Sequence, residues 1–494
     1  MAGNAIMCGI QLLKATHPEG ADPDGRQVRG IAICLTTGAL FIHGLSRRGG
    51  LALSNCFAVV KLGMLLVIIG TTIAYLVGSI GPSPALETTA WAQQPFFSHG
   101  TISKNTTFLE NIYLENSFKK PSNDPHGYSD AFLAVIYTFW GFEQANYVLG
   151  EINSPHRKFP IALGLSVSIV SVLYVAVNIC YWAVVPQYIA AKPNQNIAEA
   201  FFTITLGSLR PDYPYLGIRI ASAFIAVSTL GNLIVMSYTA TRVKQEIAKE
   251  GFLPLPKFFV PNYDISIGRI IIWMQRMSFL PQRWPFSQRW LAPINFREGT
   301  PVGASILHLI SCSILFVATA HMRATDAYIV LTGISSYLIN GFFGCLLALG
   351  ILWLRLFRSK EWKKKSAAVR PSVSIAAAAI YLVLNALPVI SNCMPSRQQS
   401  PLKWYLLPLV SWGTLVCGLL WYLGFLMIVR RKDRKTNTVI AVIKRPDVRE
   451  DPPYSGIWVQ VHETSFIDRL PTEEADRFQH DKAINIETRD GADV

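Results

Sequence analysis

The sequence predicts an all-α polytopic membrane protein. Of its 494 residues, 51% are hydrophobic and only 15% are charged, and the mean hydropathy is +0.31. Soluble domains carry about 25% charged residues. The apolar residues also gather in runs long enough to cross about 30 Å of hydrocarbon as helices. Together, the composition and these runs indicate that lipid surrounds most of the chain.

Nine of these runs are expected to be full transmembrane helices. A further apolar run at 3–15 is too short to cross a bilayer alone. The nine runs lie at 30–46, 51–80, 131–150, 159–185, 214–241, 302–320, 326–354, 373–392 and 404–429.

Basic residues in alternate loops predict the orientation of these helices. Arg47 and Arg48, Arg157 and Lys158, and many residues of 242–297 lie on one side. The opposite loops are poor in Lys and Arg, and positively charged loops stay in the cytoplasm. The basic side, and with it the C-terminus, is therefore expected to be cytoplasmic.

Two polar segments lie outside the apolar runs. Residues 1–430 are expected to form the transmembrane domain, and the polar segment 431–494 is expected to be a largely disordered cytoplasmic tail. The loop 262–300 is long and rich in Trp, Arg and Pro. It is either a basic amphipathic helix on the inner leaflet or a poorly structured insertion.

Several classes of function lack support in the sequence. The net charge is +14, but no basic stretch carries the interleaved aromatic residues of a nucleic-acid surface, so no nucleic-acid partner is expected. The cysteines form neither a disulfide framework nor a metal site. No Walker-type loop, nucleophile elbow or HExxH motif is found. We expect no enzyme activity, no cofactor and no metal.

The run 131–150 has a polar centre, where Gly141, Glu143, Gln144 and Asn146 interrupt it. Polar groups in hydrocarbon normally face a protein-lined cavity or a partner. The polar residues of such a helix either hold a polar solute or only form hydrogen bonds with neighbouring helices. Glu143 in turn could pair with a lysine, bind a proton, contact a substrate amine or sit in a water-filled vestibule. Asn146 shares its helix face.

An aromatic cluster precedes this polar centre. Tyr137, Phe139 and Trp140 crowd around Thr138 and Gly141. Such a cluster serves helix packing or forms the wall of a pocket. If the helix unwinds here, its backbone N–H and C=O groups could bind a carboxylate and an ammonium group.

Lys61 is an isolated charge within the run 51–80. At 1.5 Å per residue it lies roughly 15 Å from the start of the helix, and so it needs a cavity or a partner. It is either a cation that replaces a bound ion or takes part in proton coupling, or a structural lysine. The run 214–241 is interrupted by Ser228, Thr229, Gly231 and Asn232. These residues serve close helix packing or form a polar lining that faces Lys61. His43 is expected to be interfacial.

Three segments resemble the amino acid–polyamine–organocation transporters, in particular the L-type amino acid transporters and the fungal high-affinity methionine permeases. YTFWGFEQANYVLGEINSPHRKFP followed by LYVAVNICYWAVVP resembles their sixth and seventh helices. NCFAVVKLGMLLVIIG resembles the fifth helix, and STLGNLIVMSYTATRVKQEIAKEGFLP resembles the eighth. The resemblance extends from about residue 3 to residue 430.

The resemblance implies a LeuT-like inverted-repeat fold and amino acid movement by alternating access. In this family the substrate lies against unwound parts of the first and sixth helices, which places Tyr137, Thr138, Phe139, Trp140 and Gly141 at the substrate site. The family's fifth-helix lysine, here Lys61, occupies the position of a sodium ion in relatives. Sodium independence is therefore implied, with protons as the alternative coupling ion.

The resemblance also implies an N-terminally incomplete fold. The family's glycine-rich first-helix motif is not found, and residues 1–15 resemble only the later part of the third helix. We expect a plasma-membrane permease for methionine or a similar neutral L-amino acid. The alternatives are a permease for other neutral amino acids and a truncated, transport-inactive homologue that acts as a receptor or regulator. Oligomeric state and the need for a heavy-chain partner stay open.

Overall fold

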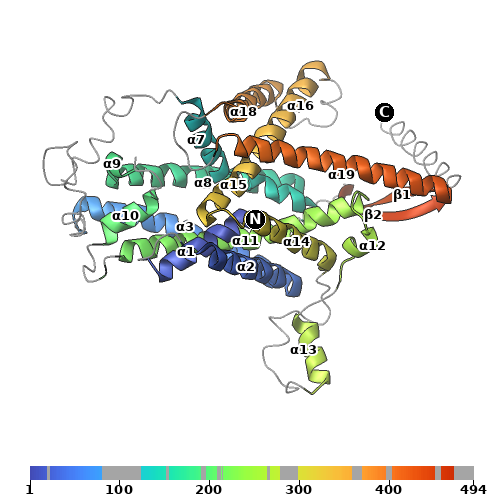
Figure 1. Ribbon diagram of the computed structural model, residues 1–494, viewed down its shortest axis with the longest axis horizontal. Coiled ribbons are helices and arrows are strands. Elements are labelled where there is room, and N and C mark those ends of the chain that lie inside the picture. The colour runs from blue at the N-terminus through green and yellow to red at the C-terminus, as the bar shows by residue number, and fades with distance from the viewer. Residues whose placement is uncertain are drawn as a thin grey trace.

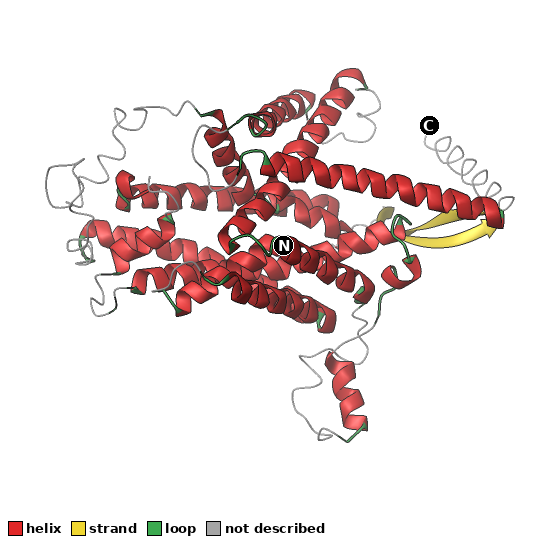
Figure 2. Cartoon of the chain, viewed as in Figure 1, coloured by secondary structure: helices red, strands yellow, loops and turns green. Residues whose placement is uncertain are grey.

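The structure is a computed structural model, and most of its described residues are helical (Figure 2). The described residues are 1–18, 23–80, 124–151, 155–190, 196–207, 213, 215–263, 267–278, 299–358, 370–395, 403–450 and 458–471.

The helices run side by side along the long axis of the molecule in the part of the bundle around α1 (Figure 1). The first half of the chain contains these helices: α1 (Ala2–Thr16), α2 (Gly25–Leu45), α3 (Arg47–Val77), α7 (Pro125–Thr138), the 3₁₀ helix η1 (Phe142–Glu151), α8 (Pro155–Val184), α9 (Gln187–Ala190), α10 (Ile197–Leu206) and α11 (Leu216–Lys249).

The second half of the chain contributes shorter helices and two strands. They are α12 (Pro256–Phe259), α13 (Ile267–Arg276), α14 (Val302–Ala318), α15 (Ala324–Ser335), the π-helix η2 (Ser336–Phe343), α16 (Gly344–Phe357), α18 (Pro371–Ser391), α19 (Leu406–Thr436), β1 (Thr438–Glu450) and β2 (Trp458–Pro471).

Among the described residues, seven helices are long and apolar enough to cross a membrane. They account for seven of the nine expected runs. The run 131–150 is instead divided into α7 and η1, and the run 302–320 corresponds to α14, which has only 17 residues. The all-α polytopic architecture is thus confirmed, with two of the expected long helices shorter or broken.

The short helix α1 lies at the centre of the bundle, where it packs against α2, α11, α14 and α15. Small residues allow this close approach. A Cβ atom added at Gly9 would lie 2.9 Å from the carbonyl oxygen of Val28, and one at Gly3 would lie 3.0 Å from Thr332. Ala5 and Ile6 are fully buried in the same cluster. Although α1 is too short to span the membrane, it therefore organises the core.

A second apolar cluster joins α3, α8, α10 and α11. Its centre is a pair of α10 residues, Phe201 and Phe202, whose rings meet edge to face at 5.3 Å. The ring of Phe202 also contacts Phe224 of α11 at 5.3 Å. Edge-to-face contacts of this kind fix ring positions as well as burying apolar area. The two clusters meet on α11, which contributes to both.

The helix α7 is held at its outer end by α18. Asp124 caps its first turn by accepting the backbone N–H of His126 at 3.2 Å. The Ser129 hydroxyl donates to the Pro388 carbonyl oxygen at 3.0 Å, and the Asn392 amide donates to Ser129. Ser129 and Asn392 are buried. These polar contacts fix a helix that has only 14 residues.

The C-terminal part of the chain differs from the expected disordered tail. α19 continues past residue 430 to Thr436. β1 and β2 then pair as an antiparallel hairpin, with a bulge between Asp447 and Val448. The expectation of a disordered tail is therefore wrong for these two strands, whose sequences are rich in β-branched residues that favour extended backbone. β2 contacts η1 and α11.

Candidate functional site

The polar centre predicted in 131–150 is a break in the helix. α7 ends at Thr138, and the N–H groups of Phe139 and Trp140 donate to the third residue before them, at 3.2 and 3.1 Å. Gly141 then has φ +113°, a backbone conformation that residues other than glycine rarely adopt. η1 follows directly. The helix thus breaks where unwinding was predicted, while the binding role of residues 137–141 stays a prediction.

The residue before the break is tied to α1. The Tyr137 hydroxyl donates to Asn4 Oδ1 at 2.7 Å, and its ring lies 5.7 Å from the ring of Trp140. Asn4 is only 6% exposed. Its amide also donates to the sulfur of Met236 in α11 at 3.3 Å. Asn4 therefore links the break to α1 and α11.

The residues after and beside the break have their own partners. The Thr239 hydroxyl of α11 donates to Gln144 Oε1 in η1 at 2.9 Å. On the α8 side, the Tyr174 hydroxyl donates to the Thr138 carbonyl oxygen at 3.3 Å. The ring of Phe139 lies 5.5 Å from that of Tyr174. The break is consequently held from three sides, by α1, α8 and α11.

The indole N–H of Trp140 is a buried hydrogen-bond donor at the break. Its Nε1 atom has no hydrogen-bond partner within the part of the chain that the structure describes. Leaving a buried donor unpaired costs about 1–3 kcal/mol, and buried donors in folded proteins are nearly always paired. The indole is therefore suited to donate to an acceptor of a bound polar molecule.

Lys61 has a partner on α11. Its Nζ atom donates to Asn232 Oδ1. The two helices touch at this level, because a Cβ atom added at Gly231 would lie 2.9 Å from Phe57 Cβ and 3.0 Å from Lys61 Cε. Gly231 thus permits the approach of α3, and the neighbouring amide oxygen satisfies the ammonium group.

Three residues of α11 form a line that we call the α11 stripe: Asn232, Met236 and Thr239. Residues with this spacing share a helix face, and the stripe is about 10 Å long at 1.5 Å per residue. The partners of the stripe are Lys61 of α3, Asn4 of α1 and Gln144 of η1. The stripe therefore connects the break in α7 with the isolated lysine.

The remaining predicted residues do not all join this arrangement. Thr229 is buried, and its hydroxyl donates back to the carbonyl oxygens of Ile225 and Ala226 at 2.8 and 3.0 Å. Ser228 lies one turn before Asn232 and is half-buried. Asn146 is exposed, and the side chain of Glu143 lies outside the described part of η1.

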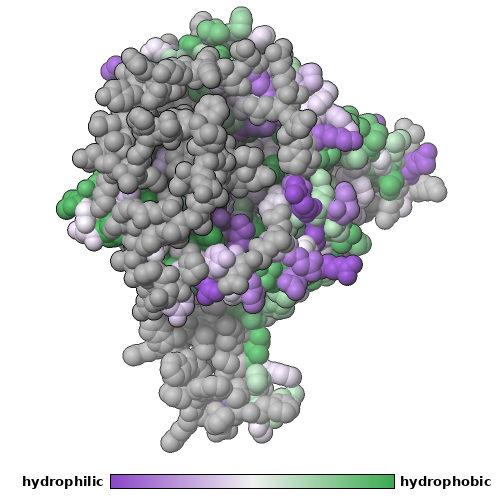
Figure 3. Space-filling view, turned by 60° about the vertical axis from the view of Figure 1, so that its left-hand side comes forward, coloured by the Kyte–Doolittle hydropathy of each residue, from purple (hydrophilic) through white to green (hydrophobic). Residues whose placement is uncertain are grey.

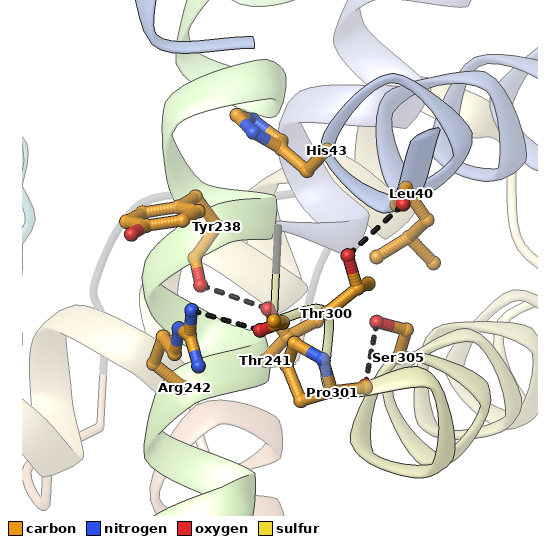
Figure 4. A pocket seen from close by; sticks show the side chains of 10 residues that line it. Leu40, His43, Tyr238, Thr241, Arg242, Thr300, Pro301 and Ser305 are labelled. Carbon is orange, nitrogen blue, oxygen red and sulfur yellow. Dashed lines mark hydrogen bonds between the residues drawn. The ribbon is translucent and has the colours of Figure 1, made fainter. Parts of the chain in front are cut away.

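A small pocket lies between α2, α11 and the start of α14 (Figure 4). His43 borders it and is buried, and its Nε2 atom lies 2.8 Å from the Ile234 carbonyl oxygen. The Thr300 hydroxyl donates to Gly44, and Arg242 donates to Gly299. Most of these lining groups are bonded to the protein itself, but the Nδ1 atom of His43 is buried and has no hydrogen-bond partner among the described residues. Within the described ranges, no group of three His, Cys, Asp or Glu residues could hold a metal ion.

Sequence reasoning missed Asn4 as a member of the site. Asn4 lies in a run that was judged too short to cross the membrane, so the sequence did not predict that this polar residue lies within the bundle. The available signal was an amide in an otherwise apolar stretch, together with the small residues around it. Asn232 was recognised as an interruption of its run, but it was not distinguished from Thr229 as the partner of Lys61.

Comparison with known proteins identifies the family of the chain. The profile of the amino acid permease family matches residues 1–417. The chain is 24% identical to the high-affinity methionine permease of Saccharomyces cerevisiae over 435 residues, which cover 87% of the chain and 63% of that permease. It is 29% identical to the b(0,+)-type amino acid transporter 1 of Homo sapiens over 140 residues, 28% of the chain and 27% of that protein.

The comparisons also define the extent of the likeness. The low-affinity methionine permease of Saccharomyces cerevisiae is 28% identical over 136 residues, 28% of the chain and 24% of that permease. The chain thus spans less than two thirds of the length of each of these relatives. The apolar helices and the family match together identify a multi-pass membrane protein. The chain belongs to the amino acid permease family.

Proposed function

We propose that this protein transports methionine or a similar neutral L-amino acid across the plasma membrane by alternating access, with residues 137–141 in contact with the substrate. The observation that carries the proposal is the break in α7, beside which the buried Nε1 atom of Trp140 has no hydrogen-bond partner among the described residues. A discontinuous helix near the middle of a bilayer offers backbone groups to a polar solute without unpaired groups in lipid. The amino acid relatives support the same class of substrate.

The residue types at the break favour a neutral side chain on the substrate. Tyr137, Thr138, Phe139, Trp140 and Gly141 carry no formal charge. An acidic or basic substrate side chain would therefore lack a counter-charge among them, and an unpaired charge in a dry site is costly. Aromatic walls suit an apolar side chain such as that of methionine, whose sulfur also contacts aromatic rings favourably.

Lys61 has a separate role in this proposal. Its ammonium group, bonded to Asn232, provides a fixed positive charge between α3 and α11. Such a charge disfavours binding of a second cation beside it. We therefore expect uptake that does not require sodium, with protons as the candidate coupling ion. We also propose that the basic loops and the C-terminus lie in the cytoplasm, because positively charged loops stay on that side of the membrane.

The test is uptake of radiolabelled methionine by cells that lack their own permeases. The 494-residue chain is expressed alone and, in a parallel arm, with any upstream open reading frame of its gene added. Uptake is expected in at least one arm, and Lys61→Ala and Gly141→Leu are expected to abolish it. Gly164→Leu is the matched control, because an added Cβ at Gly164 of α8 meets no described atom within 4 Å.

Three outcomes would contradict parts of the proposal. Absence of uptake in both arms, despite membrane expression, rules out transport of methionine. Equal competition by unlabelled acidic, basic and neutral amino acids rules out selection by an uncharged site. Replacement of sodium by choline in the medium tests the role of Lys61, since sodium-dependent uptake would contradict it.

A further inference from the structure

The two ends of the loop that contains α13 are fixed to the bundle. Tyr263 and Thr300 exchange two backbone hydrogen bonds, at 2.8 and 2.9 Å. The Thr300 hydroxyl donates to the Gly44 carbonyl oxygen at 3.0 Å, one residue before α2 ends (Figure 4). Arg242 of α11 donates to Gly299 at 3.4 Å. The base of the loop therefore lies at the level where α2 ends, which is the membrane face that carries the basic loops.

The position of α13 follows from this base. Ile267 lies four residues after Tyr263, a distance of at most about 14 Å for an extended chain. In Figure 1, α13 stands apart from the bundle, and its axis runs across the long helices rather than along them. With 10 residues it is about 15 Å long, too short to span a bilayer. α13 is thus placed to lie along the membrane face.

α13 has an exposed apolar face. Ile270, Trp273 and Met277 are spaced so that they share one side, and they are 38%, 55% and 55% exposed. In Figure 3 the projection at the foot of the view carries hydrophobic residues at its surface. Arg269 and Arg276 are seven residues apart, lie together on the adjoining side and are exposed. A helix with this division suits the boundary between headgroups and acyl chains.

We propose that α13 is an interfacial anchor that binds anionic lipid. Trp273, Ile270 and Met277 insert between acyl chains, and the guanidinium groups of Arg269 and Arg276 contact anionic headgroups. Lipid is the occupant that the observations favour, because the base of the loop fixes α13 at the face of a membrane protein. Its basic side also matches the charge of an anionic leaflet. This inference depends on the membrane setting and not on which solute is transported.

The experiment places a photo-crosslinking residue, p-benzoylphenylalanine, on α13 of the full chain in reconstituted vesicles. Trp273→p-benzoylphenylalanine probes the apolar side. Gln275→p-benzoylphenylalanine is the matched control, because two residues along a helix turn the side chain to nearly the opposite side. The vesicles contain phosphatidylcholine alone or with phosphatidylserine, and lipid adducts are measured by mass spectrometry.

We expect lipid adducts at position 273 in clear excess over position 275, with more adduct when phosphatidylserine is present. Each arginine near an anionic surface accounts for about a fivefold preference. In the Arg269→Gln/Arg276→Gln double variant, the effect of phosphatidylserine is therefore expected to fall by up to about 25-fold. High salt is expected to act in the same direction.

Three results would overturn the proposal. Equal adduct yields at positions 273 and 275 would show that the apolar side does not face lipid. Adducts on protein instead of lipid would show that α13 docks on a protein surface. Yields that do not respond to phosphatidylserine would show that the arginines do not recognise anionic lipid. Because the adducts are measured without any uptake, these results are independent of the transport test.

Discussion

In α11, the small and polar residues from Ser228 to Asn232 leave a helix of 34 residues unbroken, whereas α7 ends after 14 residues, three positions before Gly141. The two interruptions are similar in sequence, since each sets a glycine among polar residues within an apolar run. Gly231 keeps helical backbone, and its missing side chain leaves room for Phe57 and Lys61. Gly141 instead has φ +113°.

The difference shows that a glycine within a membrane span serves one of two purposes, and that its neighbours decide which. Where a facing helix approaches within about 3 Å of the missing Cβ, as at Gly231, the glycine permits packing. At Gly141 no described atom lies within 4 Å of that position, so its freedom is used by the backbone. Substitutions at the two glycines should therefore fail for different reasons.

Gly231→Leu is expected to have the largest effect. The added side chain would meet Phe57 Cβ and Lys61 Cε at 3.0 Å or less, and overpacking of this kind costs about 1–3 kcal/mol or more. We expect loss of folded protein in fluorescence-detected size-exclusion chromatography. Gly164→Leu, at an open position of α8, should elute as the unaltered protein does. Normal elution of the Gly231 variant would show that α3 and α11 do not pack closely there.

Gly141→Ala is expected to have the next largest effect, through the backbone alone. A residue held at positive φ in this region costs about 1–3 kcal/mol, and no described atom lies within 4 Å of the added Cβ. Uptake should fall more than the melting temperature, because the strain is confined to the break. The control Gly164→Ala should raise stability by up to about 1 kcal/mol, as in an ordinary helix. Unchanged uptake by the Gly141 variant would remove the break from the transport mechanism.

Asn392→Ala tests whether the short helix α7 depends on its contacts with α18. Asn392 donates to Ser129 and, at 3.1 Å, to the Pro388 carbonyl oxygen. Loss of such bonds costs about 1 kcal/mol each, so the melting temperature should fall by a few degrees. Ser391→Ala is the control, because the exposed Ser391 hydroxyl donates to the Leu387 carbonyl oxygen of its own helix at 2.7 Å. Equal melting temperatures would show that the outer end of α7 is held by other contacts.

Thr229→Val is expected to have the smallest effect. The Thr229 hydroxyl is bonded within its own helix, and valine has nearly the same shape, so the change in stability should stay below about 1 kcal/mol. Methionine uptake should be unchanged. A loss of uptake at normal expression would instead place Thr229 in the site. It would also contradict the proposed contrast between packing by α11 and substrate binding at the break in α7.

Much of the fold could be predicted because hydropathy marks helices that lie in lipid. The break in α7 was also predictable, since Gly141 and the polar residues after it lie at the depth where an unbroken helix would expose them. The central position of α1 could not be predicted from length, because buried small residues such as Gly9 act through the neighbour that they approach.

The pairing of side chains was less accessible than the positions of helices. Lys61 needed a partner by its depth alone, but the choice between Thr229 and Asn232 depends on how α11 is turned toward α3, which periodicity does not define. The β1–β2 hairpin was missed for a different reason. The tail was judged by its overall polarity, whereas a run such as TVIAVIK favours a strand locally.

The contact between β2 and η1 has a mechanical consequence. η1 begins directly after Gly141, so a rotation of the backbone at this glycine also turns the segment against which the hairpin rests. A strand of 13 residues is about 40 Å long, and a small rotation at one end therefore becomes a displacement of several ångströms at the other. The hairpin is thus a natural place for a fluorescent reporter of events deep in the bilayer.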